Sequence, residues 1–129
     1  MPSCVIDTSA VFVDLQGERG AEEARRWLKE AAISTVNLQE IASKAIDKGG
    51  PREKVSQLIE RLRLETHNLT ADLALAAGLL RIATARKSLS LGDRSCLALA
   101  RQLGVPAVTA DRDRADVADA TGVEVVLVR

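Results

Sequence analysis

The hydrophobic positions of this chain change their spacing several times, from short continuous apolar runs to recurrences every three or four residues. Apolar runs of strand length predict β-strands near 4–6, 32–35, 64–69, 107–109 and 123–128. Helical spacing in the intervening segments predicts helices over 8–15, 21–31, from 34 or 35 up to 46, 51–62, 71–85, 93–103 and 111–120.

Cap and turn residues support these boundaries. Pro51 is suited to the first residue of a helix, because the N–H it lacks has no partner there. Thr70 is a suitable N-cap for the helix over 71–85, although Gly78 disfavours an uninterrupted helix. Gly104 and Pro106 end the helix that precedes the fourth strand.

Strands that alternate with helices predict an α/β fold, a three-layer sandwich with a mostly parallel central sheet flanked by helices. A chain of 129 residues is expected to form a single domain, residues 1–129, large enough for its own core. Functional side chains in such sheets gather beyond the carboxyl ends of the strands, where the strand order reverses.

Composition narrows the class of protein. The chain is 47% hydrophobic and 28% charged, which is typical of a globular protein. No apolar run approaches the roughly 18 residues of a membrane span, and the first residues lack the basic region of a signal peptide, so we expect a cytoplasmic location. Cys4 and Cys96 lie in apolar runs without a CxxC pair, which predicts buried thiols and no zinc site.

Basic and acidic residues balance at 18 each, so any RNA binding must depend on local charge. Phe12 and Trp27 are the only aromatic residues, too few for a base-stacking platform. His67 lies in a polar stretch away from the acidic motifs, and we expect it at the surface.

Four acids follow strands or begin helices. Asp7 directly follows the first strand and Asp111 follows the strand over 107–109, so both are expected at the same edge of the sheet. Asp93 and Glu40 lie near the starts of two helices. These four carboxylates, far apart in sequence, are therefore candidates for one crevice.

Each acid also has an interpretation as a helix cap. Asp7 and Asp111 occupy N-cap positions, and the pairs Ser90 with Asp93 and Asn37 with Glu40 have the spacing of a capping box. Capping does not explain why three helix starts lie beside apolar strand ends or apolar helix faces in this order. We therefore favour a functional cluster.

The chemistry of such a cluster follows from its charge. Neighbouring carboxylates raise each other's pKa unless a divalent cation neutralises them. Magnesium and manganese prefer oxygen ligands and leave coordination positions open for phosphate oxygens. Such a cation can activate water and stabilise the leaving oxygen, which is what hydrolysis of a phosphodiester bond requires.

Four segments together resemble a PIN domain of the VapC toxin type, and the resemblance covers essentially the whole chain. They are Val5 to Ala10, Asn37 to Ile41, Leu91 to Ala100 and Val108 to Arg112. The resemblance implies a ribonuclease that depends on Mg²⁺ or Mn²⁺, acts as the toxin of a toxin-antitoxin pair, binds a cognate antitoxin protein and forms a homodimer.

The same resemblance assigns site residues. It implies that the catalytic and metal-binding residues are Asp7, Glu40, Asp93 and Asp111. Hydroxyl and basic side chains beside them are candidates for positioning the RNA: Thr8, Ser9, Thr109, Arg94 and Arg112.

The sequence departs from the family pattern after the last acid. PIN toxins often have an aromatic residue three positions after it, where this chain has Arg114, which leaves the packing of that short helix open. Asp113 and Asp116 are further acids that either supplement the metal site or face solvent.

Other functions are possible for an α/β chain of this kind. A signalling receiver would need an acid pair after the first strand, but Asp7 has Ile6 and Thr8 as neighbours. A phosphatase of the haloacid dehalogenase type would need Asp where Ser9 stands. A housekeeping RNA-processing PIN nuclease and a PIN fold used only for binding both remain alternatives.

Overall fold

A parallel sheet of five short strands forms the centre of the computed structural model, which describes residues 1–129. Its order is β3-β2-β1-β4-β5, and all four neighbouring pairs are parallel. The strands are β1 (Cys4–Ile6), β2 (Ala31–Ser34), β3 (Glu65–His67), β4 (Ala107–Thr109) and β5 (Val125–Leu127). The predicted α/β sandwich is confirmed, with a sheet that is parallel throughout.

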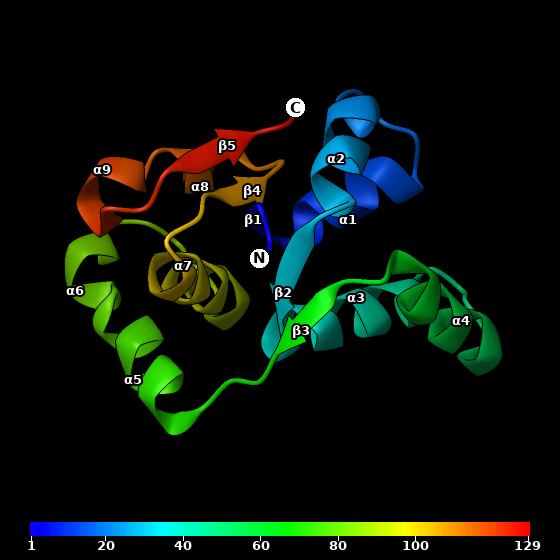
Figure 1. The fold of residues 1–129 in the computed structure, drawn as a ribbon, viewed down its shortest axis with the longest axis horizontal. Coiled ribbons are helices and arrows are strands. Elements are labelled where there is room, and N and C mark those ends of the chain that lie inside the picture. Colours follow the sequence, from blue (N-terminus) through cyan, green and yellow to red (C-terminus); the bar gives the residue numbers. More distant parts are fainter.

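Helices cover both faces of the sheet (Figure 1). In the figure, the first four helices lie to one side of the strands and most of the later helices to the other. The helices are α1 (Thr8–Leu15), α2 (Ala21–Leu28), α3 (Thr35–Asp47), α4 (Arg52–Leu62), α5 (Ala71–Leu79), α6 (Arg81–Thr84), α7 (Leu91–Leu103), α8 (Arg112–Ala115) and α9 (Ala118–Thr121).

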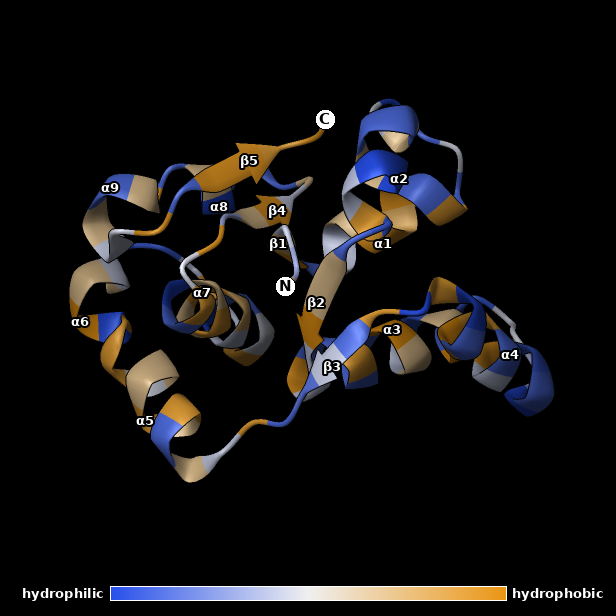
Figure 2. Ribbon diagram, viewed as in Figure 1, coloured by the Kyte–Doolittle hydropathy of each residue, from blue (hydrophilic) through white to orange (hydrophobic).

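Alternation along the buried strands divides the core into two clusters, one on each face. Cys4 and Ile6 point into one cluster and Val5 into the other, and Ile33 and Ala32 of β2 divide in the same way. Because both faces are covered, the central strands are mostly apolar, and β2 and β4 are mainly tan to orange in the hydropathy colouring (Figure 2). The buried polar exceptions are Ser34 and Thr109, at the ends of β2 and β4.

Two helix starts and the continuation of one helix differ from the prediction. Pro51 is not the first residue of α4 but precedes it, with an extended backbone at φ −73° and ψ 155°. Helix α7 begins at Leu91 rather than Asp93, because the side chain of Ser90 caps it. The helix predicted over 71–85 is interrupted at Leu80, whose ψ of −20° is that of a tighter turn.

Three further details of the pattern were wrong. The helix predicted over 111–120 is divided into α8 and α9 at Val117, whose side chain is buried in the core. Helix α2 ends at Leu28, because the chain already enters β2 at Ala31. The helix predicted to end at 46 continues to Asp47, and the apolar side chain of Ile46 near its end is 55% exposed.

The strand order places the reversal point at β1. From β1 the chain adds β2 and β3 on one side and later adds β4 and β5 on the other. Loops leaving β1 and β4 therefore diverge, and a crevice opens beyond the carboxyl ends of these two strands. Function is expected at this edge.

The buried cysteines agree with the sequence prediction. Cys4 and Cys96 are both buried and free, and burial raises the pKa of the Cys4 thiol to about 12. None of the helices is both long enough and apolar enough to cross a lipid bilayer.

Removal of the α7 cap is expected to lower stability. The Ser90 hydroxyl accepts a hydrogen bond from the N–H of Asp93, so Ser90→Ala should lower the free energy of unfolding by about 1 kcal/mol. Ser88→Ala, a change at an exposed neighbour, is the control and should stay within about 0.5 kcal/mol of wild type. Urea denaturation measures both, and equal stabilities would contradict the capping role.

Candidate functional site

The four acids predicted from the sequence lie at the crevice beside β1. Asp7 follows β1, Glu40 lies in the second turn of α3, Asp93 lies in the first turn of α7, and Asp111 follows β4 by two residues. Asp7 and Asp93 are almost fully buried, at 4% exposure each, whereas Glu40 and Asp111 are half-buried. The fold thus brings together carboxylates that are up to a hundred residues apart in sequence.

Hydroxyl groups hold the carboxylate of Asp7 in place. Its Oδ2 accepts hydrogen bonds from Ser9 Oγ at 2.8 Å and from Thr109 Oγ1 at 2.9 Å. Backbone N–H groups hold these hydroxyls in turn, since Ala110 N–H donates to Ser9 and Asp111 N–H donates to Thr109. The strand ends of β1 and β4 are therefore joined by one hydrogen-bond network.

Burial dominates the ionisation of Asp7. Desolvation raises the pKa of Asp7, and the neighbouring charge of Asp93 raises it further. The hydrogen bond from Ser9, the charge of Arg114 and the hydrogen bond from Thr109 act in the opposite direction without cancelling the shift. The folded protein therefore holds Asp7 in a form that takes up a proton more readily than a free aspartate.

Glu40 is positioned from three elements. Its Oε1 accepts hydrogen bonds at 2.9 Å from Thr8 Oγ1 and from Asn37 Nδ2. Asn37 Nδ2 also donates to the carbonyl of Gly92, which ties α3 to α7. A side chain at position 92 would meet the Glu40 carboxylate, because a Cβ there would lie 2.2 Å from Oε1. Only glycine leaves room for Glu40 at this position.

The interpretation of the acids as caps is correct for two of the four. Asp93 Oδ2 accepts from the N–H of Ser90, which completes a capping box, and Asp111 Oδ1 accepts from the N–H of Asp113. Asp7 precedes α1 but makes no capping bond with its side chain. The capping box expected for Glu40 was wrong, because Ser34 caps α3 instead. Asp93 and Asp111 each keep a second oxygen for the crevice.

A guanidinium group lies between these free oxygens. Arg114 Nε pairs with Asp93 Oδ1 and Arg114 Nη1 pairs with Asp111 Oδ2, while Nε is also 3.9 Å from Asp7 Oδ2. Desolvation opposes its charge, but the hydrogen bond to Asp93 and the charges of Asp93, Asp7 and Glu40 raise the pKa of Arg114. A permanent cation thus occupies the middle of the acidic cluster.

The donor set at this crevice suits a hard divalent cation. Four carboxylates, without histidine or thiolate among them, form the ligand type that Mg²⁺ and Mn²⁺ prefer. These acids already hold one positive charge, because Arg114 is paired with three of them. In this structure no three acidic, histidine or cysteine side chains are placed as a metal cage. Arg114 lies between Asp93 and Asp111.

The predicted substrate-positioning residues fall into two groups. The hydroxyls of Thr8, Ser9 and Thr109 are engaged with the carboxylates themselves. Arg94 donates to the carbonyl of Leu89, and Arg112 is exposed on α8.

The remaining candidates lie outside the cluster. Asp113 and Asp116 are exposed, and Asp116 Oδ2 is 3.7 Å from Lys87 Nζ. His67 lies on the edge strand β3 beside Glu65, away from the acids.

Three residues have roles in the site that the sequence did not assign. Asn37 was noted only as a possible cap, Gly92 only as the residue before an expected helix, and Arg114 only as a departure from a family pattern. Arg114 was the only one of the three that the sequence marked as unusual, because it stands where the family pattern often has an aromatic residue. The contact of Gly92 with Glu40 depends on two helices far apart in sequence, whereas Asn37 and Glu40 lie three residues apart on α3.

Fold and site together define a parallel α/β protein with a cation-holding carboxylate cluster at the reversal point of its sheet. The sequence matches the PIN domain family over residues 4–120, and the chain belongs to this family. The resemblance of the sequence motifs to a PIN domain is therefore confirmed. No curated protein sequence matches the chain.

Solved structures with the same fold include several toxin-antitoxin proteins. A toxin-antitoxin complex from Klebsiella pneumoniae matches with TM-score 0.77 and 22% identity, covering 98% of both chains. DNA-bound VapBC from Salmonella typhimurium matches with TM-score 0.76 and 20% identity, covering all of both chains. Mycobacterium tuberculosis VapC20, described as a Sarcin-Ricin loop cleaving toxin, matches with TM-score 0.72 and 23% identity over 89% of this chain and 95% of that one.

Neutralising Asp7 is expected to stabilise the metal-free protein. Because the folded pKa of Asp7 is raised above its ordinary value, wild-type stability falls as pH rises through that interval. Asp7→Asn removes this cost, so in EDTA at pH 7 its free energy of unfolding should be roughly 1 to 2 kcal/mol higher. The gain should vanish at acidic pH, where the wild-type carboxyl is protonated. Urea denaturation from pH 3 to 7 measures this, and a variant less stable at pH 7 would contradict it.

Proposed function

We propose that this PIN domain is a ribonuclease that depends on Mg²⁺ or Mn²⁺ and acts as the toxin of a toxin-antitoxin pair. The observation that supports the proposal is that Asp7, Asp93 and Asp111 surround the guanidinium of Arg114, on which the charge of Glu40 also acts, so the protein already holds a cation there. The toxin role is supported by the descriptions of the structural matches, which include toxin-antitoxin complexes. A cognate antitoxin is therefore the expected partner, and a homodimer remains a prediction.

Each acid has a distinct part in holding the metal. Asp7 is the fixed ligand, buried and held by two hydroxyls, so its unshared oxygen has a defined direction. Asp93 and Asp111 each present one oxygen that capping does not use. Glu40, half-buried and oriented by Thr8 and Asn37, closes the cluster from α3. When bound, the cation activates water for attack and offsets the charge that develops on the phosphate.

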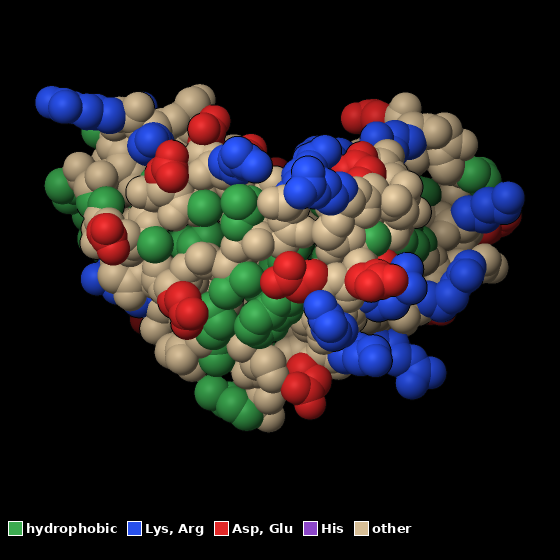
Figure 3. Space-filling view, turned by 90° about the horizontal axis from the view of Figure 1, so that it is seen from above, with side chains coloured by type: hydrophobic (Ala, Val, Ile, Leu, Met, Phe, Trp, Pro, Cys, Tyr) green, Lys and Arg blue, Asp and Glu red, His purple; other side chains and the backbone are tan.

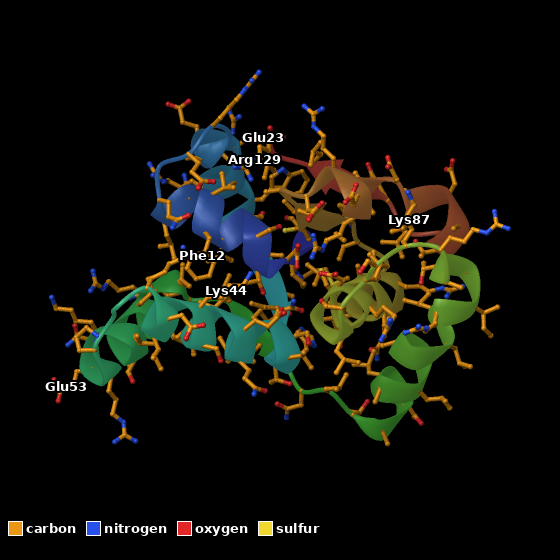
Figure 4. The ribbon with its side chains drawn as sticks, turned by 180° about the vertical axis from the view of Figure 1, so that it is seen from behind. Phe12, Glu23, Lys44, Glu53, Lys87 and Arg129 are labelled. Carbon is orange, nitrogen blue, oxygen red and sulfur yellow. The ribbon has the colours of Figure 1, made fainter.

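Basic side chains flank the cluster on both sides. Lys44 lies on the wall of two surface cavities of about 430 and 550 Å³, one reaching Ser9 and the other reaching Glu40. A third cavity, of about 460 Å³, extends from Asp111 to Arg86 and Lys87. Figure 4 shows Lys44 on one side of the site and Lys87 on the other, and Lys and Arg side chains stand along an indentation in the outline (Figure 3).

These cavities suit a polynucleotide that crosses the metal site. Lys44 is exposed on α3 and forms no ion pair, so its ammonium group is free to contact a phosphate. Phe12 and Lys48 lie beside it, with the Lys48 ammonium 5.7 Å from the centre of the Phe12 ring. Positive charge on both sides of the scissile bond positions the backbone without reading the bases.

Loss of a metal ligand should abolish cleavage of RNA without unfolding the protein. Purified Asp7→Asn and Asp93→Asn are expected to lose at least about a hundredfold in rate, because each removes a charge that holds the cation. Wild type should cleave a labelled RNA with Mg²⁺ or Mn²⁺ and not in EDTA. Circular dichroism spectra provide the control for folding. Cleavage retained by both variants would overturn the site assignment.

A growth assay separates the toxin from a housekeeping nuclease. Expression of the wild type without an antitoxin should arrest bacterial growth, whereas the same level of Asp7→Asn should not. Equal growth of the two cultures, alongside metal-dependent cleavage in vitro, would favour the housekeeping alternative.

Removal of the Lys44 charge should weaken substrate binding. Lys44→Ala is expected to raise KM for a short RNA by roughly three- to tenfold and to reduce the salt dependence of binding by about one unit of slope. The turnover number kcat should change little, because Lys44 makes no contact with the carboxylates. Lys54→Ala, at an exposed position on α4, is the matched control. An unchanged KM would exclude a phosphate contact at Lys44.

A further inference from the structure

Arg114 differs from every other basic residue of the chain in its surroundings. Its side chain is 26% exposed and is paired with Asp93 and Asp111 at once, with Asp7 at 3.9 Å. Arg112, two residues earlier on the same short helix, is exposed and takes part in no ion pair. The difference follows from the helix, which turns position 114 toward the acids and position 112 toward solvent.

The oxygens that Arg114 contacts are the ones a metal would need. Asp93 Oδ2 is occupied by the N–H of Ser90, so Oδ1 is the oxygen left for the crevice, and Arg114 holds it. Asp111 Oδ1 is occupied by the N–H of Asp113, and Arg114 holds the remaining Oδ2. A guanidinium and a divalent cation cannot both contact these oxygens, because two positive charges within a few ångströms repel each other.

The protein also contains a place to which the arginine can withdraw. Arg114 lines the surface cavity of about 460 Å³ that opens beside Lys87 and Ser88, and Asp7 is not among the residues that line it. The exposed carboxylate of Asp113 lies on the wall of the same cavity. Movement of Arg114 into this cavity would require rotation of its side chain, and no strand of the sheet lines the cavity.

We propose that Arg114 is an internal competitor of the metal: its guanidinium neutralises the acidic cluster in the metal-free protein and must leave Asp93 and Asp111 before a divalent cation binds. The proposal rests on the metal site of the proposed function. It makes the metal-free protein stable, at the cost of a weaker affinity for Mg²⁺ or Mn²⁺. Position 114 is thus a determinant of metal affinity.

Calorimetric titration of the metal-free protein with Mn²⁺ tests the competition directly. Arg114→Met has a side chain of similar length without charge, and it should bind Mn²⁺ roughly tenfold more tightly or better, since no cation has to be displaced. Arg112→Met, the matched change on the same helix, should bind as the wild type does. Equal affinities of Arg114→Met and wild type would overturn the proposal and leave the metal site intact.

Thermal melting provides a second readout that does not depend on activity. In EDTA, Arg114→Met should melt below the wild type, because three carboxylates then lack their partner. Saturating Mn²⁺ should remove most of that difference. A variant that melts below the wild type by the same margin with and without Mn²⁺ would show a packing role only, which contradicts the proposal.

Two further outcomes are distinguishable. If Arg114→Met does not fold in EDTA, Arg114→Lys serves instead, because lysine keeps the charge but cannot contact Asp93 and Asp111 through two separate nitrogens. This variant should bind Mn²⁺ with an affinity at or moderately above that of the wild type. A Lys variant that binds more weakly than the wild type would then contradict the competition. If neither wild type nor any Arg114 variant binds Mn²⁺, the metal site of the proposed function fails and this inference fails with it.

Discussion

The repulsion between carboxylates gathered at one edge of the sheet is the constraint on which this structure depends. Asp7 and Asp93 are buried within reach of each other's charge, and burial alone already raises the pKa of Asp7. The fold offsets this repulsion with hydroxyl donors from Ser9 and Thr109 and with the guanidinium of Arg114. The chain itself thus supplies the positive charge that lies among these carboxylates.

The parallel sheet explains why the acids meet at this edge. Parallel strands present all their carboxyl ends at the same side, and the reversal of strand order at β1 separates the loops that follow β1 and β4. Residues after these strands therefore line the same crevice, although they are far apart in sequence. Helices α3 and α7 then approach from opposite faces, and the close contact of Gly92 with Glu40 sets their distance.

Capping and metal binding are not exclusive interpretations of the same acid. A carboxylate has two oxygens, so Asp93 caps α7 with one and faces the crevice with the other, and Asp111 does the same on α8. The caps fix the directions of the second oxygens, which lowers the entropy lost when a ligand binds to them. Local helix chemistry thus orients the groups that the proposed reaction uses.

The sequence by itself determined the order of strands and helices and the apolar runs of the buried strands, because both depend on local spacing. It also showed that four acids lie near strand ends or helix starts, because these ends are visible in the chain. Boundaries at Leu80, Leu91 and Val117 depended on backbone and side-chain contacts that periodicity does not contain. Only the tertiary structure decided that Gly92 lies against Glu40 and that Arg114 enters the cluster. The physical reason is that a charge acts on whatever lies within a few ångströms, and these neighbours are brought together by the packing of the sheet and its helices.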